Sequence, residues 1–305
     1  MASLTHSAAS ANATHIPSAF SIYNNDFLNI IGSAPKLEVI LENNDYPFAH
    51  EASVYIPTSE SLFVSSNLYT DPVTNEKTIK VTKVSVNAHP VTSEIINSTI
   101  PMPNGGVNND GVTGNFYGRQ FNSINDVVVA KDGSFWFTDP IYAYKQGIRP
   151  KPQLPNQVYR TSASLQMDSV GLMAFLFSPD EKTVYISDTA ETIGDGSKDL
   201  TQPATIYAFD MTTIHGQPFL TNRRVFAMPG DGIPDGIKVD QDGNVYAGCG
   251  DGVNVWSAGG VLLGKILVKD GTSNFSFGRN GQMFILNENK IYRAQLNRKV
   301  HGTLF

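Results

Sequence analysis

The chain has 305 residues, of which 41% are hydrophobic, and its 26 glycines and 17 prolines favour a fold with many short strands and turns. A net charge of −6, with no block of lysine or arginine, argues against a nucleic-acid-binding or membrane-binding surface. The single cysteine, Cys249, excludes an intramolecular disulfide bond. These features predict a cytoplasmic protein with a small-molecule partner and leave its oligomeric state open.

The first twenty residues lack both the charged start and the apolar run of a secretory signal peptide. No later segment has the length and apolar character of a membrane-spanning helix. We therefore expect residues 1–20 to form a flexible N-terminal arm and residues 21–305 to form one domain.

From residue 51 onward, a unit of about fifteen residues recurs, in which a polar residue precedes an apolar strand, a tight turn and a second apolar strand. The turns carry pairs such as Asp132-Gly133 and Asp242-Gly243, which are typical of β-hairpins. Five copies pair these apolar runs in chain order: 54–56 with 62–64, 127–129 with 135–137, 175–177 with 184–186, 237–239 with 245–247, and 275–277 with 283–285.

Repeats that hold several strands and no convincing amphipathic helix are typical of propeller blades around a channel. The sequence therefore predicts an all-β fold, a β-propeller with a central channel. The spacing of the copies favours six blades, because the gap between the first and second copies would hold two. One of those two is abbreviated, and its expected remnant is Asn108–Val112.

The residue seven positions before each turn is where an innermost strand should begin. These positions are occupied by Glu51, Asn125, Met173, Asp235 and Ser273. In a propeller such positions converge at one mouth of the channel. Two carboxylates and an amide there would suit a hard cation such as calcium, although strand ends are also polar simply because they are wet.

Several segments resemble one protein family along most of the chain from about residue 45. They are His50-Glu51-Ala52, 121–127, 136–140, 153–160, 203–209 and Pro234-Asp235-Gly236-Ile237. This combination is similar to the SMP-30/gluconolactonase family, and especially to its fungal lactonase branch. The resemblance implies a six-bladed propeller. It also implies a site where a glutamate, two asparagines and an aspartate hold a divalent ion, usually calcium, that polarises a lactone carbonyl and activates water.

Glu51, Asn125 and Asp235 match three of these four family positions, but the fourth departs from the family pattern. Met173 stands where the family usually has an asparagine. A thioether is a soft ligand that does not suit calcium, so we expect a degenerate metal site and no cofactor. The alternative is a calcium ion held by Glu51, Asn125 and Asp235. The strand register around Ser164–Leu172 stays open, because that segment fits the family pattern poorly.

Five further residues are candidates for binding the substrate: His50, Phe121, Tyr142, Met173 and Ser273. Each ring has a plainer alternative, because most aromatic residues of propellers pack between blades. His50 lies next to Glu51 in the sequence, where it is either a proton donor or a hydrogen-bonded core residue.

Two functions follow, both with Glu51, Asn125 and Asp235 as catalytic residues. The first is a non-hydrolytic ring-forming reaction, because propellers resembling this one act as hetero-Diels–Alderases in fungal tropolone-sesquiterpenoid biosynthesis. Such a cycloaddition of a quinone methide with a terpene alkene needs an apolar pocket and hydrogen bonds to a conjugated carbonyl, which Met173 suits. The alternative is a calcium-dependent lactonase. A binding propeller without catalysis is a third possibility. The sequence favours the first and a small apolar substrate.

Overall fold

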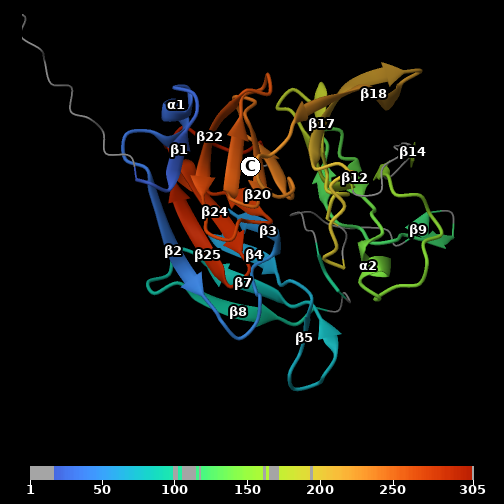
Figure 1. Cartoon of the computed structure of the whole chain (residues 1–305), viewed down its shortest axis with the longest axis horizontal. Helices are drawn as coiled ribbons and strands as arrows, with labels where there is room; N and C mark the ends of the chain where they lie inside the picture. The colour runs from blue at the N-terminus through green and yellow to red at the C-terminus, as the bar shows by residue number, and fades with distance from the viewer. Residues whose placement is uncertain are drawn as a thin grey trace, which may run out of the picture.

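The computed structural model describes residues 17–98, 102–104, 115–116, 118–160, 163–164, 172–192 and 195–303. These residues form five antiparallel sheets of four or five strands, which we call blades 1 to 5 in the chain order of their first hairpins. The sheets stand side by side round the molecule (Figure 1). The protein is therefore an all-β propeller.

Each blade begins with one of the predicted hairpins. Blade 1 contains β3 (Glu51–Ile56), β4 (Ser61–Ser65), β7 (Val81–Ser85) and β8 (Thr92–Ile96). Blade 2 contains β11 (Val127–Val129), β12 (Phe135–Thr138), β13 (Val158–Arg160) and β14 (Ala163–Ser164). Blade 3 contains β15 (Leu172–Phe177), β16 (Thr183–Asp188), β17 (Thr205–Ile214) and β18 (Gln217–Ala227).

The last two blades also take up strands from the start of the chain. Blade 4 contains β19 (Ile237–Val239), β20 (Val245–Cys249), β21 (Gly252–Trp256), β22 (Leu262–Leu267) and β1 (Phe20–Ile22). Blade 5 contains β23 (Phe275–Phe277), β24 (Gln282–Asn287), β25 (Lys290–Gln295) and β2 (Lys36–Glu42). All five predicted hairpins are thereby confirmed.

The remaining elements are short connections, as the lack of an amphipathic pattern predicts. They are the ribbons β5 (Tyr69–Thr70) with β6 (Lys77–Thr78) and β9 (Asn115–Phe116) with β10 (Arg119–Gln120), the helices α1 (Phe27–Ile31) and α2 (Tyr142–Lys145), and a 3-10 turn at Arg279–Gly281. None of the helices in the described residues is long and apolar enough to cross a membrane.

The number of blades stays a prediction. Blades 1 to 5 lie in the described residues, whereas the expected remnant of the abbreviated blade, Asn108–Val112, lies outside them. Most of the segment of open register, Ser164–Leu172, also lies outside the described residues, and β15 begins at Leu172.

Apolar side chains fill the spaces between neighbouring blades. Trp136 of blade 2 stacks on Phe175 of blade 3, with ring centroids 5.5 Å apart, and Tyr246 of blade 4 packs edge-on to Phe277 of blade 5 at 5.1 Å. All five residues of β20 and of β21 are buried. Burial of these faces holds the blades together, because an isolated sheet would expose them to water.

The two ends of the domain are fastened into the same part of the ring. Strand β2 pairs with β25 from Lys36 opposite Gln295 to Glu42 opposite Lys290, and Figure 1 shows blue β2 running beside red β25. Strand β1 begins at Phe20, the last residue of the predicted arm, and pairs with β22 as a fifth strand of blade 4. Residues 1–16 lie outside the described part of the chain.

Candidate functional site

The strand starts that the sequence singled out lie at the same end of the blades, and hydrogen bonds join one to the next. The backbone amide of Asn125 donates to the backbone carbonyl of Thr138 at 3.1 Å. The Thr138 hydroxyl in turn donates to the Met173 carbonyl at 2.7 Å. Thr138 therefore links the start of blade 2 to the start of blade 3.

The chain of contacts continues through blades 4, 5 and 1. The Ser187 hydroxyl donates to the carbonyl of Asp235 at 3.0 Å. The Gly236 amide donates to the Ser273 carbonyl at 2.8 Å, and the Ser273 hydroxyl donates to the His50 carbonyl at 2.5 Å. Since His50 directly precedes Glu51, all five predicted strand starts lie round one mouth of the propeller.

A glycine takes the place of the linking hydroxyl in blade 4. Gly248 occupies the position on β20 that Thr138 has on β12 and Ser187 has on β16. A Cβ atom on Gly248 would lie 2.6 Å from the Thr272 carbonyl oxygen and 2.8 Å from that of Ser273. The glycine therefore lets the backbone of blade 5 approach directly.

Glu51 is positioned by an irregular stretch of backbone. A bulge lies between Glu51 and Val54, and the two residues inside it, Ala52 and Ser53, have φ angles of 69° and 46°. This left-handed conformation costs about 1–2 kcal/mol for each residue with a side chain. Such strain directly after a buried carboxylate is typical of functional sites, because a packed surrounding structure must maintain it.

Replacing Ala52 with glycine should separate stability from activity. Glycine adopts this conformation without strain, so we expect Ala52→Gly to keep or raise the melting temperature. It should lower kcat about tenfold, because Glu51 becomes less firmly held. The matched control is Asn222→Gly, at an exposed position with a φ of 53° far from the mouth. Equal activity of the two variants would contradict a positioning role for the bulge.

Glu51 is 4% exposed and accepts a hydrogen bond from a partner that sequence reasoning missed. The Asn274 side-chain amide donates to Glu51 Oε2 at 2.8 Å. Asn274 reaches this position because residue 236 is glycine, where a Cβ atom would lie 2.6 Å from the Asn274 amide carbon. Asp235 thus provides one carboxylate, and Gly236 leaves room for the Asn274 amide that orients the other carboxylate, that of Glu51.

Asp235 and Glu51 form an electrostatically coupled pair of carboxyl groups. Burial and the charge of Glu51 raise the pKa of Asp235 well above its ordinary value. Burial also raises the pKa of Glu51, against the charge of His50 and the hydrogen bond from Asn274. Asp235 Oδ1 is buried and has no hydrogen-bond partner among the described residues. Two such groups can share a proton or hold a cation between them.

His50 forms an ion pair with Glu288, a second residue that sequence reasoning missed. Their Nδ1 and Oε1 atoms are 2.6 Å apart, and Asn67 also donates to the Glu288 carboxylate. Burial lowers the pKa of His50, but Glu288, through its hydrogen bond and charge, and the charges of Glu51 and Asp235 raise it to about 9. His50 is therefore a cation at neutral pH beside the carboxyl pair.

The predicted aromatic residues have different surroundings. The Tyr142 hydroxyl lies 2.5 Å from the Thr189 hydroxyl, and burial raises its pKa, with smaller contributions from the charges of Asp235, Asp188 and Glu51. The Phe121 ring instead packs edge-on to two rings of blade 2, at 5.0 Å from Phe137 and 5.1 Å from Tyr159. Phe121 thus follows the packing alternative, because it completes the interior of its own blade.

Asn125 and Met173 lie at their strand starts as expected. Asn125 is 6% exposed, and Met173 is half-buried in a bulge of β15 between Leu172 and Phe175. No group of three or more histidine, cysteine, aspartate or glutamate side chains in the described ranges is arranged to hold a metal ion. An ion at this mouth would therefore need amide oxygens in addition to Glu51 and Asp235.

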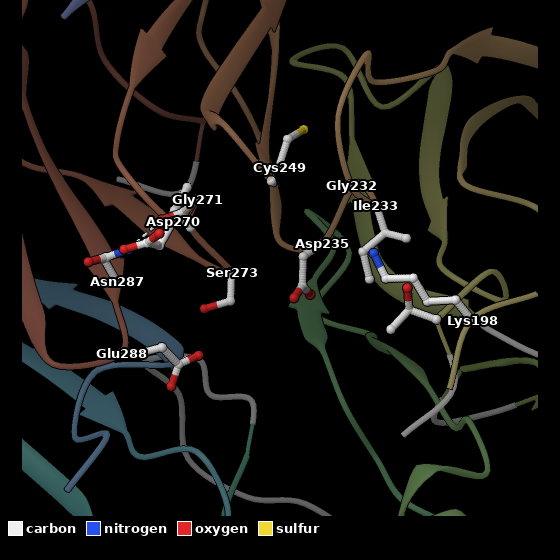
Figure 2. A pocket seen from close by; sticks show the side chains of 13 residues that line it. Lys198, Gly232, Ile233, Asp235, Cys249, Asp270, Gly271, Ser273, Asn287 and Glu288 are labelled. Carbon is white, nitrogen blue, oxygen red and sulfur yellow. Dashed lines mark hydrogen bonds between the residues drawn. The ribbon is translucent and has the colours of Figure 1, made fainter. Parts of the chain in front are cut away.

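A pocket of about 240 Å³ opens beside the carboxyl pair, on the side of blades 3, 4 and 5 (Figure 2). Two predicted residues, Asp235 and Ser273, lie in its wall. The other residues that line it were not singled out by the sequence: Thr192, Lys198, Gly232, Ile233, Cys249, Gly250, Asp270, Gly271, Thr272, Asn287 and Glu288. Most of them lie on loops between strands, while Cys249 and Asn287 end strands β20 and β24. Polar side chains and apolar surface both line the pocket, so the predicted apolar substrate stays a prediction.

Cys249 lies in the pocket wall but is 2% exposed, and burial raises the pKa of its thiol. A thiol that keeps its proton is a poor nucleophile. Cys249 is therefore not a candidate nucleophile.

The chain matches a known protein family. Residues 110–287, more than half of the chain, match the model of the SMP-30/gluconolactonase/LRE-like region. The lactonohydrolase oryL of Aspergillus oryzae is 28% identical, over 88% of this chain and 73% of that protein. A gluconolactonase of Zymomonas mobilis is 30% identical, over 60% of this chain and 53% of that protein.

Solved structures support the same fold. A gluconolactonase of Xanthomonas campestris superposes with a TM-score of 0.72 at 24% identity, covering 91% of this chain and 94% of that one. A calcium-binding protein of Agrobacterium tumefaciens, described as regucalcin, superposes with a TM-score of 0.52 at 14% identity, covering 87% of this chain and 94% of that one.

Proposed function

Because the chain belongs to the SMP-30/gluconolactonase/LRE-like family, we propose that it is a lactone hydrolase. The observation that carries the proposal is the pair of interacting carboxyl groups of Glu51 and Asp235 at the mouth, where Asp235 also lines the pocket. The relatives named lactonohydrolase and gluconolactonase support the same reaction class. This assignment favours the hydrolytic alternative over the ring-forming reaction.

The chain's own residues supply acid–base chemistry. Asp235 holds a proton more firmly than an ordinary aspartate, since its pKa is raised by burial and by Glu51. Glu51 is oriented by Asn274 and can accept a proton from the attacking water. Tyr142 remains protonated at neutral pH and can donate to an oxygen of the substrate, since its pKa is also raised. Opening a lactone needs both transfers, because water loses a proton and the leaving alkoxide gains one.

The residues at the mouth also fit a divalent cation. The orphaned Oδ1 atom of Asp235 and the adjacent Glu51 carboxylate provide hard oxygen ligands, and Asn125 would contribute an amide oxygen. A cation bound there supplies Lewis-acid polarisation of a carbonyl. The calcium-binding structural relative supports calcium as the ion. Met173, at the fourth position, leaves the set with three oxygen-bearing side chains, so we expect weak binding.

Ring opening of glucono-1,4-lactone tests the proposed function directly. We expect acid release to follow enzyme concentration, to increase when calcium is added, and to decrease with a chelator. If hydrolysis of several aldonolactones does not exceed the buffer rate in the presence of calcium, the hydrolase assignment is wrong.

Calcium should raise the melting temperature, and Met173→Asn should enlarge that rise. A ligand present at a hundred times its Kd stabilises the native state by about 2.7 kcal/mol, which corresponds to about 5 °C for a protein of this size. In 10 mM calcium we expect a smaller rise for the native chain, because binding is weak, and a larger one when residue 173 offers an amide oxygen. Met228→Asn is the control, since Met228 is 64% exposed. An equal response of both variants would remove Met173 from the ligand positions.

One observation favours a second function. The half-buried Met173 side chain gives the mouth an apolar part, which suits the cycloaddition of a quinone methide with a terpene alkene. Asn125 and Tyr142 would then hydrogen-bond the conjugated carbonyl. Incubation with a quinone-methide precursor and humulene, followed by mass spectrometry, separates the two reactions. A stereocontrolled adduct without lactone opening would favour this second function.

We also propose that the propeller has a sixth blade between blades 1 and 2. The Ser65 hydroxyl donates to the Asn104 carbonyl at 2.8 Å, in the same way that Thr138 and Ser187 bind the first strand of the next blade. Asn104 then stands where a further innermost strand would begin. A crystal structure that resolves residues 99–117 tests this directly.

A further inference from the structure

The wall of the pocket that faces Glu288 and Asn287 carries a lysine. Figure 2 shows the Lys198 side chain beside Ile233, across the pocket from Glu288, with Asp235 between them. Lys198 belongs to the connection between β16 and β17. Within this connection, only Thr189, the hydrogen-bond partner of Tyr142, has a role in the proposed lactone hydrolysis.

Backbone contacts hold the described part of this connection in place. Lys198 and Thr192 form an antiparallel bridge, and the Asp199 amide donates to the Glu191 carbonyl at 2.8 Å. The Glu191 amide in turn donates to the Pro203 carbonyl at 2.9 Å. The lysine therefore extends from a fastened segment, which keeps its ammonium group near the pocket.

The two acidic residues nearest to Lys198 in the sequence form hydrogen bonds with other residues and no ion pair with it. Asp195 Oδ1 accepts hydrogen bonds from the amide and hydroxyl of Ser197, and Asp199 Oδ1 accepts the same pair from Thr201. Lysine ion pairs elsewhere in the described chain use other partners, and none involves Lys198. Its charge is available to a ligand.

The opposite wall has a different character. The Glu288 carboxylate is already paired with His50, while Asp270 and Asn287 offer oxygen atoms that accept hydrogen bonds from hydroxyl groups. The pocket thus has two unlike walls, with a lysine that makes no ion pair among the described residues on one side and hydrogen-bond acceptors on the other. A hydroxylated ligand with one anionic end matches both walls.

On the basis of the proposed lactone hydrolysis, we propose that Lys198 binds a carboxylate of the substrate, so that the enzyme prefers lactones that carry an acid group. The carboxylate is bound by Lys198 while the ring carbonyl faces Asp235 and Glu51. Lys198 is a specificity-determining residue here, because it touches the part of the substrate that does not react. Removing the positive charge of Lys198 should therefore raise KM and leave kcat nearly unchanged.

Two lactones that differ at one carbon test this proposal. Glucaro-1,4-lactone carries a carboxylate at the position where glucono-1,4-lactone has a hydroxymethyl group. We expect the native enzyme to prefer the glucaro-lactone and Lys198→Met to raise its KM about tenfold, with no change for the glucono-lactone. The preference should also decrease with salt. Lys182→Met is the control, because Lys182 is an 82% exposed lysine on the β15–β16 turn, at the far end of the strands.

Calorimetric binding of the same two lactones separates this proposal from the hydrolase assignment. If the native protein binds the glucaro-lactone more tightly than Lys198→Met does but opens neither ring, the Lys198 site stands and the hydrolase assignment fails. If the native enzyme opens both lactones and Lys198→Met keeps the same preference between them, the hydrolase stands and the Lys198 site is overturned. Binding of neither lactone also overturns the Lys198 site.

Discussion

Replacing Glu51 with glutamine should lower kcat/KM for lactone opening by about a thousandfold while leaving the protein folded. Glutamine keeps the shape of the side chain and can still accept the hydrogen bond from Asn274. It cannot take a proton from water, and loss of a positioned acid–base group commonly costs about 10²–10⁴ in rate. It also removes the negative charge from the carboxyl pair, which a cation at the mouth would need.

The stability of Glu51→Gln should move in the opposite direction from its activity. Burial raises the pKa of Glu51, which means that the folded protein disfavours its ionised form. A neutral amide avoids that cost, so we expect the melting temperature to stay the same or rise at neutral pH. A decrease of several degrees would indicate instead that Glu51 serves to hold the blades together.

A matched control lies at the other end of the same hairpin. Glu60 is in the turn between β3 and β4, where its carboxylate lies 3.6 Å from Arg279. Glu60→Gln removes the same charge from the same blade without touching the mouth, so its kcat/KM should stay within about twofold of the native value. Activity of Glu51→Gln close to that of Glu60→Gln would exclude Glu51 from the reaction.

The second large effect concerns the contact between blades 4 and 5. Gly248→Ala places a methyl group 2.6 Å from the Thr272 carbonyl oxygen and 2.8 Å from that of Ser273. Both atoms belong to backbone, which cannot rotate away as a flexible side chain would. Overpacking of this kind costs about 1–3 kcal/mol, so we expect the melting temperature to fall by several degrees.

The kcat/KM for lactone opening should fall as well, because the segment that must move, which leads into β23, contains Ser273. The Ser273 hydroxyl donates to the His50 carbonyl, next to Glu51. Gly259→Ala is the control, since Gly259 lies in a turn of the same blade and its nearest neighbouring atom is the Ser257 hydroxyl oxygen at 3.8 Å. Thermal melts and lactone assays on both variants check the prediction. A Gly248→Ala protein as stable as Gly259→Ala would show that the two blades adapt without cost.

Local patterns were sufficient to predict the hairpins and the positions that meet at the mouth. Turn residues and apolar runs report on neighbouring strands, and propeller symmetry then places Glu51, Asn125, Met173, Asp235 and Ser273 at equivalent points. No chemical pattern in the sequence distinguishes a reacting carboxylate from one that is merely exposed to water at a strand end. Their roles therefore stay predictions.

The partners of these residues could not be predicted from the sequence, because they come from other blades. Asn274 is 223 residues from Glu51, and Glu288 is 238 residues from His50. Neither stands in a motif of its own, and Lys198 lies on a loop with no repeat pattern. Gly236 was one weak signal, because a glycine directly after Asp235 is not needed there for a turn. In the structure, Asn274 fills the space that a side chain at residue 236 would occupy.

The pairing of β2 with β25 also has a consequence for the order of events during synthesis. The partners of Lys36 through Glu42 are residues 290–295, so the ribosome must add about 250 residues before this sheet edge is covered. At about 5–20 residues per second, β2 waits between about 12 and 50 seconds as an unpaired strand. Unpaired strands readily add to other chains. Nascent chains that stall before residue 290 should therefore be the ones that need a chaperone.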